Sequence, residues 1–590
     1  MNIDRLLLIK VFTVIISFCP FEACADMLYL NSGESVEGEI VEYTDQYVKI
    51  DNGTGVEITY FEEEIMSIEG RPKNKIDKYS DKVSGQYHQL LIEWLKGSQD
   101  LRTGFPVSFS VLPQYKKEIY GRMCGSESVT GIIERMIVEE GVSVYDTAVY
   151  QMVLSMRGGK NDLERAYRPV AVYWKGSLGE LKNIRAGGEP GQAFIYDTDK
   201  RDAVSSDLTR EGERGFVFRI FNAKGKYNTQ DPLDGKTRYD DFPNWPTVHW
   251  EDWKPIAGEN AWIVLAALQL YHKKYFDPDV GAYKKNNAIE LKLAEEIARA
   301  AILLQAENGG IRMAPIGTFC NLIGIDNEGD PAYIEKQLNE FAHKQNGHSK
   351  DGSAGIVGNM SPLKRWYYYE ISSENNISWN AAFRMLYKIT GNPIYREAQN
   401  RTMEYLRSVW DVDGNVFYQG AHFKEGEWIP SREYFATDVQ AWAIVSLGPQ
   451  RIDELFGEGS SYRIWKKTKE YSGAYNGFGY LSGVGFTKEK DRICIEWTAG
   501  AIMATRALAE YYQDINPIWA DECQKDSESM RDGIEAFRYK YSENKAAYSY
   551  SSKRGWIPFG WFSHEPEVLS LVSTSWVVLV DANYNPFFLH

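Results

Sequence analysis

The chain has 590 residues and a formal net charge of −16, with 43% hydrophobic and 25% charged residues. This composition is ordinary for a globular protein. The acidic balance argues against nucleic acid and anionic membrane surfaces as partners. Aromatic residues reach 14%, a surplus that typically fills cores or forms stacking surfaces. We therefore expect one large domain or several domains, and a neutral or cationic substrate.

Residues 1–25 have the pattern of a signal peptide. Arg5 and Lys10 flank an apolar run, and the later "ACA" offers a cleavage site before Asp26. The run is short for a membrane span of ~20 residues. We expect an exported mature chain, periplasmic or secreted, without an integral membrane span. A lipoprotein signal at Cys24 is the alternative.

Residues 26–70 are predicted to form a small all-β unit. Apolar and polar residues alternate in "MLYLNSGESVEGEIVEYTDQYVKIDNGTGVEITYFEEEIMSIEG", where "NSG" and "NG" mark turns. About five such strands close their own edges when they form a barrel. The unit resembles the small SH3-like or Sm-like barrels at the front of many bacterial envelope proteins, which implies a spacer or interaction module. The polar segment 71–85 is typical of a linker.

From residue 86 the chain is predicted to be mainly α-helical. Apolar residues recur at helical spacing in segments such as "NAWIVLAALQLYHKKY" and "AIELKLAEEIARAAILLQAE". Within 165–250, "RPVAVYW", "AFIYD" and "GFVFRIF" are typical of short strands. We expect a helical catalytic domain over 86–590 that contains an irregular β-containing insertion.

Six helices begin in a shared way, with a polar or acidic residue, then a small or aromatic residue, then an apolar run. These runs lack a polar face, as expected for helices buried on most sides, and amphipathic helices lie between them. We predict six helical hairpins closed into a ring, whose parallel inner helices bring their N-termini around one cleft. The starts are at Asp146 in "VYDTAVYQMVL", Glu259 in "GENAWIVLAAL", Glu374 in "SSENNISWNAAF", Asp438 in "ATDVQAWAIVSL", Glu496 in "CIEWTAGAIMAT" and Thr574 in "VSTSWVVLV".

This layout resembles the six-hairpin (α/α)6 toroid of glycoside hydrolases and some polysaccharide lyases, over roughly residues 130–585. The resemblance implies an enzyme with a polysaccharide or oligosaccharide substrate. Glycoside hydrolysis needs two carboxyl groups, one to protonate the leaving oxygen and one to activate water or attack the sugar. Carboxyl groups crowded in a cleft raise one another's pKa, and a general acid at neutral pH needs a raised pKa.

Glu259, Glu374 and Glu496 are the candidate catalytic residues. Glu259 and Glu374 lead because a Glu side chain reaches beyond a helix cap. Each is also followed by an asparagine, Asn260 or Asn375, that can orient a substrate hydroxyl. The alternative is that these acidic residues only cap their helices or favour the helix dipole. The sequence leaves open which carboxyl group is the acid, and whether the reaction inverts or retains.

Further residues are candidates for substrate binding. Some accompany the helix starts, and others lie in "YNTQDPLDG", "YDDFPNW" or "GWIPFGWF". The segment "PNWPTVHWEDW" places three Trp in a loop that is hard to bury, which favours stacking on sugar rings. Capping and core packing are the alternatives. The full set is Asp146, Asn260, Asn375, Asp438, Asp231, Asp240, Asp241, Trp245, Trp250, Trp253, Trp497 and Trp561.

The sequence carries no metal or cofactor pattern, because C-x-x-C and H-E-x-x-H spacings are both absent. We therefore expect no metal site and no cofactor. Export permits disulfides among the four cysteines that follow the signal segment but does not require them. These cysteines are Cys124, Cys320, Cys494 and Cys523.

Two other functions fit the sequence. A polysaccharide lyase on the same fold would need a Tyr or His base, for which His249 and His422 are candidates. The acidic helix starts oppose the polyanionic substrate of such a lyase. A noncatalytic envelope protein that binds glycan would fit the front barrel and the aromatic surplus.

Overall fold

The structure of the protein is a computed structural model. It describes residues 26–30, 32, 34–43, 47–52, 57–61, 65–69, 86–123, 129–181, 184–186, 214–228, 230–236, 252, 254–315, 319–321, 364–432, 434–488, 490, 492–557 and 561–590. The predicted signal peptide and linker lie outside these residues. The chain divides into two compact units, Met1–Gln86 and Tyr87–His590. No helix within the described residues is long and apolar enough to cross a membrane.

The first unit contains a five-stranded antiparallel sheet with the order β4-β3-β2-β1-β5. Alternation of apolar and polar residues gives the sheet one buried face, which contains Leu28, Val48 and Ile50. The predicted short strands are present, and closure of the sheet into a barrel stays a prediction. The strands are β1 (Asp26–Leu30), β2 (Ser35–Tyr43), β3 (Tyr47–Asp51), β4 (Glu57–Phe61) and β5 (Ile65–Glu69).

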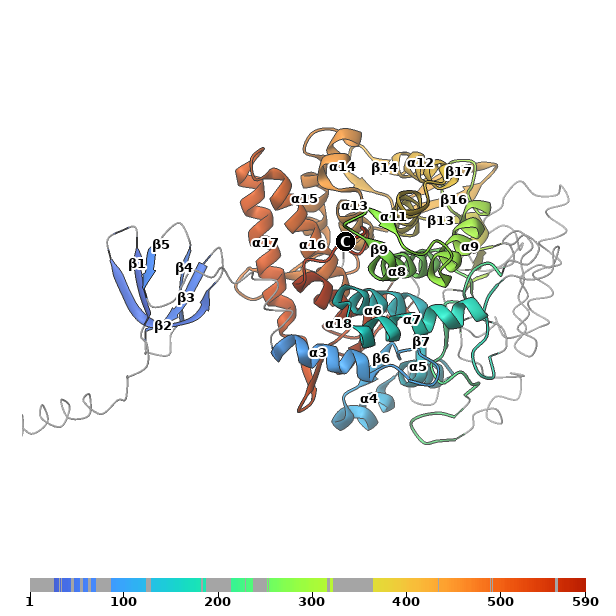
Figure 1. Cartoon of the computed structure of the whole chain (residues 1–590), viewed down its shortest axis with the longest axis horizontal. Helices are drawn as coiled ribbons and strands as arrows, with labels where there is room; N and C mark the ends of the chain where they lie inside the picture. The colour runs from blue at the N-terminus through green and yellow to red at the C-terminus, as the bar shows by residue number, and fades with distance from the viewer. Residues whose placement is uncertain are drawn as a thin grey trace, which may run out of the picture. The chain divides into compact units, whose positions relative to one another are not determined.

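The described residues of the second unit contain six inner helices that form a closed ring (Figure 1). Each inner helix contacts the next one along the chain, and the last contacts the first. This closure establishes the predicted (α/α)6 toroid. The inner helices are α6 (Val144–Arg157), α8 (Ala257–Tyr275), α11 (Ser373–Thr390), α13 (Thr437–Leu447), α16 (Ile495–Tyr512) and α18 (Leu571–Asp581).

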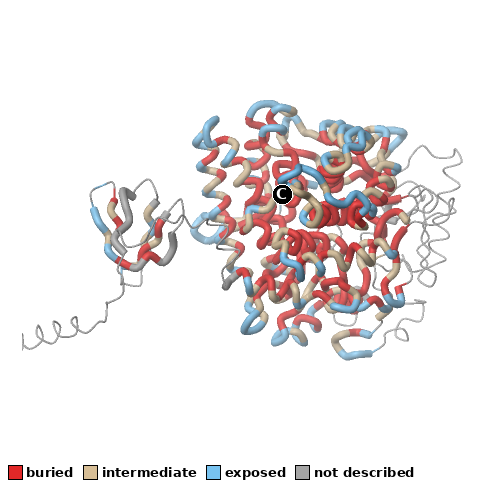
Figure 2. Tube along the Cα trace, viewed as in Figure 1, coloured by how far each residue is buried: buried red, intermediate tan, exposed pale blue. Residues whose placement is uncertain are grey.

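A second layer of helices surrounds the ring, and each outer helix packs on the inner helix that precedes it. The inner helices are buried almost all round, whereas the outer helices expose one polar face (Figure 2). This difference follows the two hydrophobic patterns of the sequence. The outer helices are α7 (Lys160–Lys175), α9 (Ile289–Leu303), α12 (Pro393–Ser408), α14 (Pro449–Phe456), α15 (Ser460–Ser472) and α17 (Pro517–Glu535).

Further helices complete the toroid near its beginning. In α3 (Gln86–Gly97), the His88 Nε2 atom is 3.7 Å from an oxygen of Asp581, the last residue of α18. This contact joins α3 to the final inner helix, so the described part of the toroid extends back to residue 86. The remaining helical segments are η2 (Pro113–Tyr115), α4 (Lys116–Arg122), α5 (Val129–Glu140) and η7 (Tyr367–Tyr369).

Short antiparallel strand pairs join the helices. Three strands, β7, β13 and β24, end directly before inner helices α6, α11 and α18 and so fix where these helices begin. The strands are β6 (Phe109–Val111), β7 (Gly141–Ser143), β8 (Ile220–Asn222), β9 (Phe276–Asp277), β10 (Ala282–Tyr283), β11 (Phe319–Asn321), β12 (Lys364–Trp366), β13 (Glu370–Ser372), β14 (Trp410–Asp411), β15 (Val416–Phe417), β16 (Gly420–Lys424), β17 (Glu427–Ser431), β18 (Gly473–Tyr475), β19 (Leu481–Val484), β20 (Arg538–Ser542), β21 (Lys545–Tyr548), β22 (Gly555–Ile557), β23 (Trp561–Ser563) and β24 (Val568–Ser570).

One predicted strand is wrong. "RPVAVYW" lies inside α7, with Pro169 within the helix. Val170 and Tyr173 are buried and lie three residues apart, so packing on one helix face overrides the strand propensity of the valines. "GFVFRIF" contributes the start of β8, whereas "AFIYD" lies outside the described residues.

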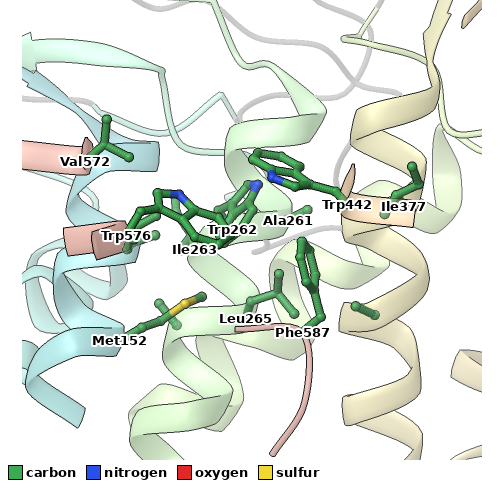
Figure 3. Close-up of a cluster of buried hydrophobic side chains, with 14 of the residues drawn as sticks. Met152, Ala261, Trp262, Ile263, Leu265, Ile377, Trp442, Val572, Trp576 and Phe587 are labelled. Carbon is green, nitrogen blue, oxygen red and sulfur yellow. The ribbon is translucent and has the colours of Figure 1, made fainter. Parts of the chain in front are cut away.

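Large aromatic side chains fill the middle of the ring. The Trp262 ring centroid lies 5.1 Å from that of Trp442 and 5.8 Å from that of Trp576, and Figure 3 shows the three side chains meeting between the helices. Phe587, from the segment after α18, is fully buried with its ring 5.3 Å from Trp262. Arg384 donates a hydrogen bond of 2.9 Å to the Phe587 carbonyl and so holds this segment in place. The middle of the ring is therefore filled by packed side chains rather than by an open channel along the described inner helices.

Candidate functional site

Five of the six inner helices in the described toroid carry an acidic residue in the first turn. None of these residues is the N-cap, because other residues occupy that position. Ser143, Ser372 and Cys494 accept the capping N–H groups of α6, α11 and α16. The carboxyl groups can therefore serve another purpose than capping. They are Asp146, Glu259, Glu374, Asp438 and Glu496.

Four of these carboxyl groups have raised pKa values. Burial raises the pKa of Asp146 and of Asp438 to about 7, and that of Glu496 to about 8. Burial, followed by the charges of Asp438 and Glu259, raises the pKa of Glu374 well above its usual range. A desolvated carboxyl group resists ionisation because water no longer stabilises its charge. The site can therefore hold protonated carboxyl groups near neutral pH.

The five carboxyl groups interact in the order of the ring. After burial, the charge of Glu259 raises the pKa of Asp146 on one side and of Glu374 on the other. Asp438 likewise raises the pKa of Glu374 and of Glu496, and Asp146 raises that of Glu496. Because each group affects its neighbours around the ring, the helix starts converge on one space. The structure thus brings these five predicted residues together.

The Ser378 hydroxyl donates a hydrogen bond of 3.3 Å to Glu374 Oε1, which opposes the rise of the Glu374 pKa. The Trp262 side chain acts in the same direction. Burial and the charges of the neighbouring carboxyl groups outweigh both effects. Glu374 is therefore the strongest candidate in the cluster for a protonated general acid.

Glu496 is held by a buried chain of hydrogen bonds. The Tyr145 hydroxyl donates to Glu496 Oε1, and the Trp576 indole donates to the Tyr145 oxygen at 2.9 Å. Burial raises the pKa of Tyr145 well above its usual range, so the phenol remains a donor. This chain fixes one oxygen of Glu496 and ties it to the aromatic core.

Glu259 pairs with a cation. Arg219 Nε lies 3.1 Å from Glu259 Oε1, and Arg219 Nη1 lies 3.6 Å from Asp252 Oδ2. The Lys254 ammonium group lies 3.0 Å from Asp252 Oδ1. Acidic and basic side chains therefore alternate from Glu259 through Arg219 and Asp252 to Lys254. Arg219 thus places a positive charge beside Glu259. Sequence reasoning missed Arg219, whose signal is a single charge inside the apolar run "GFVFRIF".

The two asparagines that follow the leading glutamates have structural contacts. Asn260 is fully buried, accepts the Val217 N–H at 2.8 Å and donates to the Val217 carbonyl at 2.9 Å. These contacts account for the Asn260 side chain within the fold, and its role in substrate binding stays a prediction. Asn375 is also buried, and its Oδ1 lies only 2.1 Å from the position that a Cβ on Gly258 would take. Asn375 thus packs α11 tightly against the first turn of α8.

Two more predicted substrate ligands belong to the interior. Trp497 is buried, and its ring lies 4.8 Å from that of Phe486 in an edge-on contact. Asp231 is fully buried and makes a two-pronged ion pair with Arg135, with Arg135 Nε 2.8 Å from Oδ1. Both side chains thus have partners within the fold, and their roles in substrate binding stay predictions.

The remaining predicted ligands cannot be placed among the others. Trp561 lies in β23, and its side chain is outside the described part of the chain. Asp240, Asp241, Trp245, Trp250 and Trp253 lie outside the described residues, as does His249. Their roles in substrate binding stay predictions.

The described residues also form a pocket of about 220 Å³ at the other end of the ring. Its lining comes from the C-terminal halves of α6 and α8 and from the segment after α18. It contains none of the five carboxyl groups. The lining residues are Met156, Gln269, His272, Lys273, Tyr584 and His590.

No cluster of three or more His, Cys, Asp or Glu side chains in the described residues has the geometry of a metal site. Of the four cysteines considered, Cys494 and Cys523 are described, and both are free and buried. The site that can be built from the described residues is therefore the ring of five carboxyl groups with Arg219, Tyr145 and Trp262.

No protein-family model and no curated protein matches the sequence. Similar solved structures include cellobiose 2-epimerase from Bacillus thermoamylovorans, with 8% identity, coverage of 85% of this chain and 97% of that chain, and a TM-score of 0.46. Cellobiose 2-epimerase from Spirochaeta thermophila has 13% identity, coverage of 87% and 98%, and a TM-score of 0.45. A GH76 α-mannanase from Bacteroides thetaiotaomicron has 10% identity, coverage of 86% and 98%, and a TM-score of 0.42.

Proposed function

We propose that the protein is a glycoside hydrolase that cleaves a polysaccharide or oligosaccharide at the carboxyl-lined end of the toroid. The observation that carries this proposal is the ring of five carboxyl groups, four of them with raised pKa values and one paired with Arg219. A protonated carboxyl group beside an ionised one is the combination that glycoside hydrolysis requires.

In this mechanism Glu374 is the general acid. Its raised pKa keeps a proton on the carboxyl group near neutral pH, and that proton passes to the glycosidic oxygen as the bond breaks. Glu259, paired with Arg219, activates water or attacks the anomeric carbon. The charge of Glu259 disfavours ionisation of Glu374, so Glu374 keeps its proton until the glycosidic bond breaks.

The other carboxyl groups bind and orient the sugar. Glu496 has one oxygen fixed by Tyr145, which leaves its second oxygen to accept a sugar hydroxyl. Asp146 and Asp438, with pKa values near 7, each have the capacity to donate or accept a hydrogen bond. A substrate rich in hydroxyl groups satisfies such a ring better than an anion, which the ring would repel. We extend the proposal to an exported protein on the basis of the N-terminal segment.

Incubation of the purified protein with a panel of neutral and uronate-containing polysaccharides and oligosaccharides tests this proposal. We expect new reducing ends with the wild-type protein and a loss of at least 100-fold in rate with Glu374→Gln, since general acid catalysis contributes roughly 10²–10⁴-fold. Glu397→Gln, an exposed change on outer helix α12, is the matched control and should retain the wild-type rate.

Three results would contradict the hydrolase. An unsaturated uronic product that absorbs ultraviolet light would show a lyase. A changed sugar without new reducing ends would show an epimerase or isomerase. Tight glycan binding without turnover, unaffected by Glu374→Gln, would show a noncatalytic binding protein.

A further inference from the structure

The hairpin of β18 and β19 exposes three aromatic side chains at its tip. Tyr475 is 52% exposed, Phe478 90% and Tyr480 66%. Phe478 is the most exposed large hydrophobic residue of the described chain, although most of the described aromatic residues are at least partly buried. Apolar side chains gathered at one exposed point typically mark a binding surface. We call these three residues the aromatic tip.

Hydrogen bonds fix the shape of the aromatic tip. Asn476 Oδ1 accepts the N–H of Phe478 at 2.9 Å and that of Tyr480 at 3.1 Å. The Asn476 N–H donates to the Tyr480 carbonyl at 2.9 Å. Gly479 has a φ of 86°, a left-handed conformation that favours glycine. The rings are thus presented by an ordered turn, so ligand binding costs little conformational entropy.

The base of the hairpin is attached to the helix start that carries Glu496. The Cys494 N–H donates to the Val484 carbonyl at 2.9 Å, and the Val484 N–H donates to the Thr498 hydroxyl oxygen at 3.0 Å. The hairpin therefore leaves the toroid at the end where the carboxyl groups converge. Five residues separate Val484 from Gly479, which at about 3.3 Å per residue places the tip about 16 Å from the base.

The hairpin extends outward across the rim of the toroid. A Cβ on Gly533, near the end of outer helix α17, would lie 2.1 Å from the Ser482 carbonyl oxygen. Charges of Lys469 on α15 and of Glu522 and Asp526 on α17 act on the Tyr475 hydroxyl. The hairpin thus runs along α17 from Gly533 toward Glu522, and the aromatic tip lies over the outer helices α15 and α17.

We propose that the aromatic tip binds a polysaccharide chain outside the cleft, with sugar rings stacked on Phe478, Tyr480 and Tyr475. The inference rests on the proposed function and adds to it that the substrate is a polymer long enough to reach from the carboxyl groups to the aromatic tip. Aromatic faces pack on the apolar faces of sugar rings, and the tyrosine hydroxyls reach the sugar hydroxyls. A second copy of the chain fits less well, because three side chains bury far less area than a stable interface requires.

Affinity electrophoresis tests the proposal. Native gels contain mixed-linkage β-glucan, xylan, α-mannan or starch, and all proteins carry Glu374→Gln so that the polymer is not degraded. We expect at least one polysaccharide to retard the protein. Phe478→Ala and Tyr480→Ala should each weaken the apparent affinity roughly 2–10-fold. Ile518→Ala removes another exposed apolar side chain, at the start of α17, and should leave retardation unchanged.

Kinetics in the active background supply the second readout. Phe478→Ala should raise KM for the polymer and leave kcat and KM for a disaccharide unchanged, because a disaccharide is too short to reach the aromatic tip. Retardation on the gels without any turnover by the protein that retains Glu374 would contradict the proposed hydrolase but support binding of polysaccharide at the aromatic tip. No retardation by any of the four polysaccharides, or self-association that Phe478→Ala abolishes in sedimentation, would overturn the inference.

Discussion

Gly258→Ala should destabilise the protein, although alanine is the better helix former. The introduced Cβ would lie 2.1 Å from Asn375 Oδ1 and 2.6 Å from Asn375 Cγ, both far inside contact distance. Without this contact, alanine in place of glycine would stabilise the helix by about 0.5–1 kcal/mol. Overpacking costs about 1–3 kcal/mol. We therefore expect the free energy of unfolding to fall by about 1–2 kcal/mol.

Urea unfolding of a double-mutant cycle measures this effect. Gly258→Ala should become stabilising by about 0.5–1 kcal/mol in an Asn375→Ala background, because the clashing atoms are gone. Gly121→Ala in α4, where nothing lies within 4 Å of the new Cβ, is the control and should not destabilise. A stabilising Gly258→Ala in the wild-type background would refute the close approach of α8 and α11, and with it the convergence of their first turns.

Three further predictions follow from the burial of charged and aromatic groups. Burial raises the pKa of Asp146 to about 7, so its contribution to stability is full below its usual pKa and is lost as pH rises through about 7. Asp146→Asn should remove up to about 1.4 kcal/mol per pH unit from the pH dependence of urea unfolding, and an unchanged profile would contradict the burial. Asp231→Asn leaves Arg135 buried without its carboxylate and should cost about 3–5 kcal/mol in the same assay; a loss below 1 kcal/mol would argue against the buried pair. Phe587→Ala should lower the free energy of unfolding by about 3–5 kcal/mol through a cavity at the ring axis, and an unchanged melting temperature would show that this segment does not fill the ring.

The helix starts were predictable because the sequence pattern indicates both which helices are buried on all sides and which of their ends meet. Apolar runs without a polar face identify inner helices, and acidic residues at their beginnings identify the end at which they meet. The contacts from α6 around to α18 confirm the ring. The influence of Asp146, Glu259 and Glu374 on one another agrees with the predicted convergence.

Helix geometry separates these residues from their neighbours in sequence. Successive residues in an α-helix point about 100° apart, because one turn takes 3.6 residues. Next to Glu259, Asn260 binds the Val217 backbone, and next to Glu496, the Trp497 ring packs against Phe486. Spacing of three or four residues is therefore a better guide than adjacency in sequence to which side chains lie together. Trp262 follows Glu259 by three and Ser378 follows Glu374 by four, and both influence Glu374.

Contacts between distant segments could not be predicted from one sequence. Arg135 and Asp231 are 96 residues apart, and Tyr145 and Glu496 are 351 apart. Nothing local indicates such partners, because each depends on how the completed ring packs. The same holds for Arg219, whose position in an apolar run signals only that its charge needs a buried or half-buried partner.

The central claim is that Glu374 delivers a proton to a glycosidic oxygen at the carboxyl-lined end of the toroid. A pH–rate profile of reducing-end release, measured for the wild-type protein and for Glu374→Gln on the same glycan, tests it most directly. We predict that the wild-type rate falls at high pH only above the usual range of a glutamate, and that Glu374→Gln loses both that alkaline limb and at least 100-fold of the rate. An unchanged rate and profile in Glu374→Gln would contradict the account.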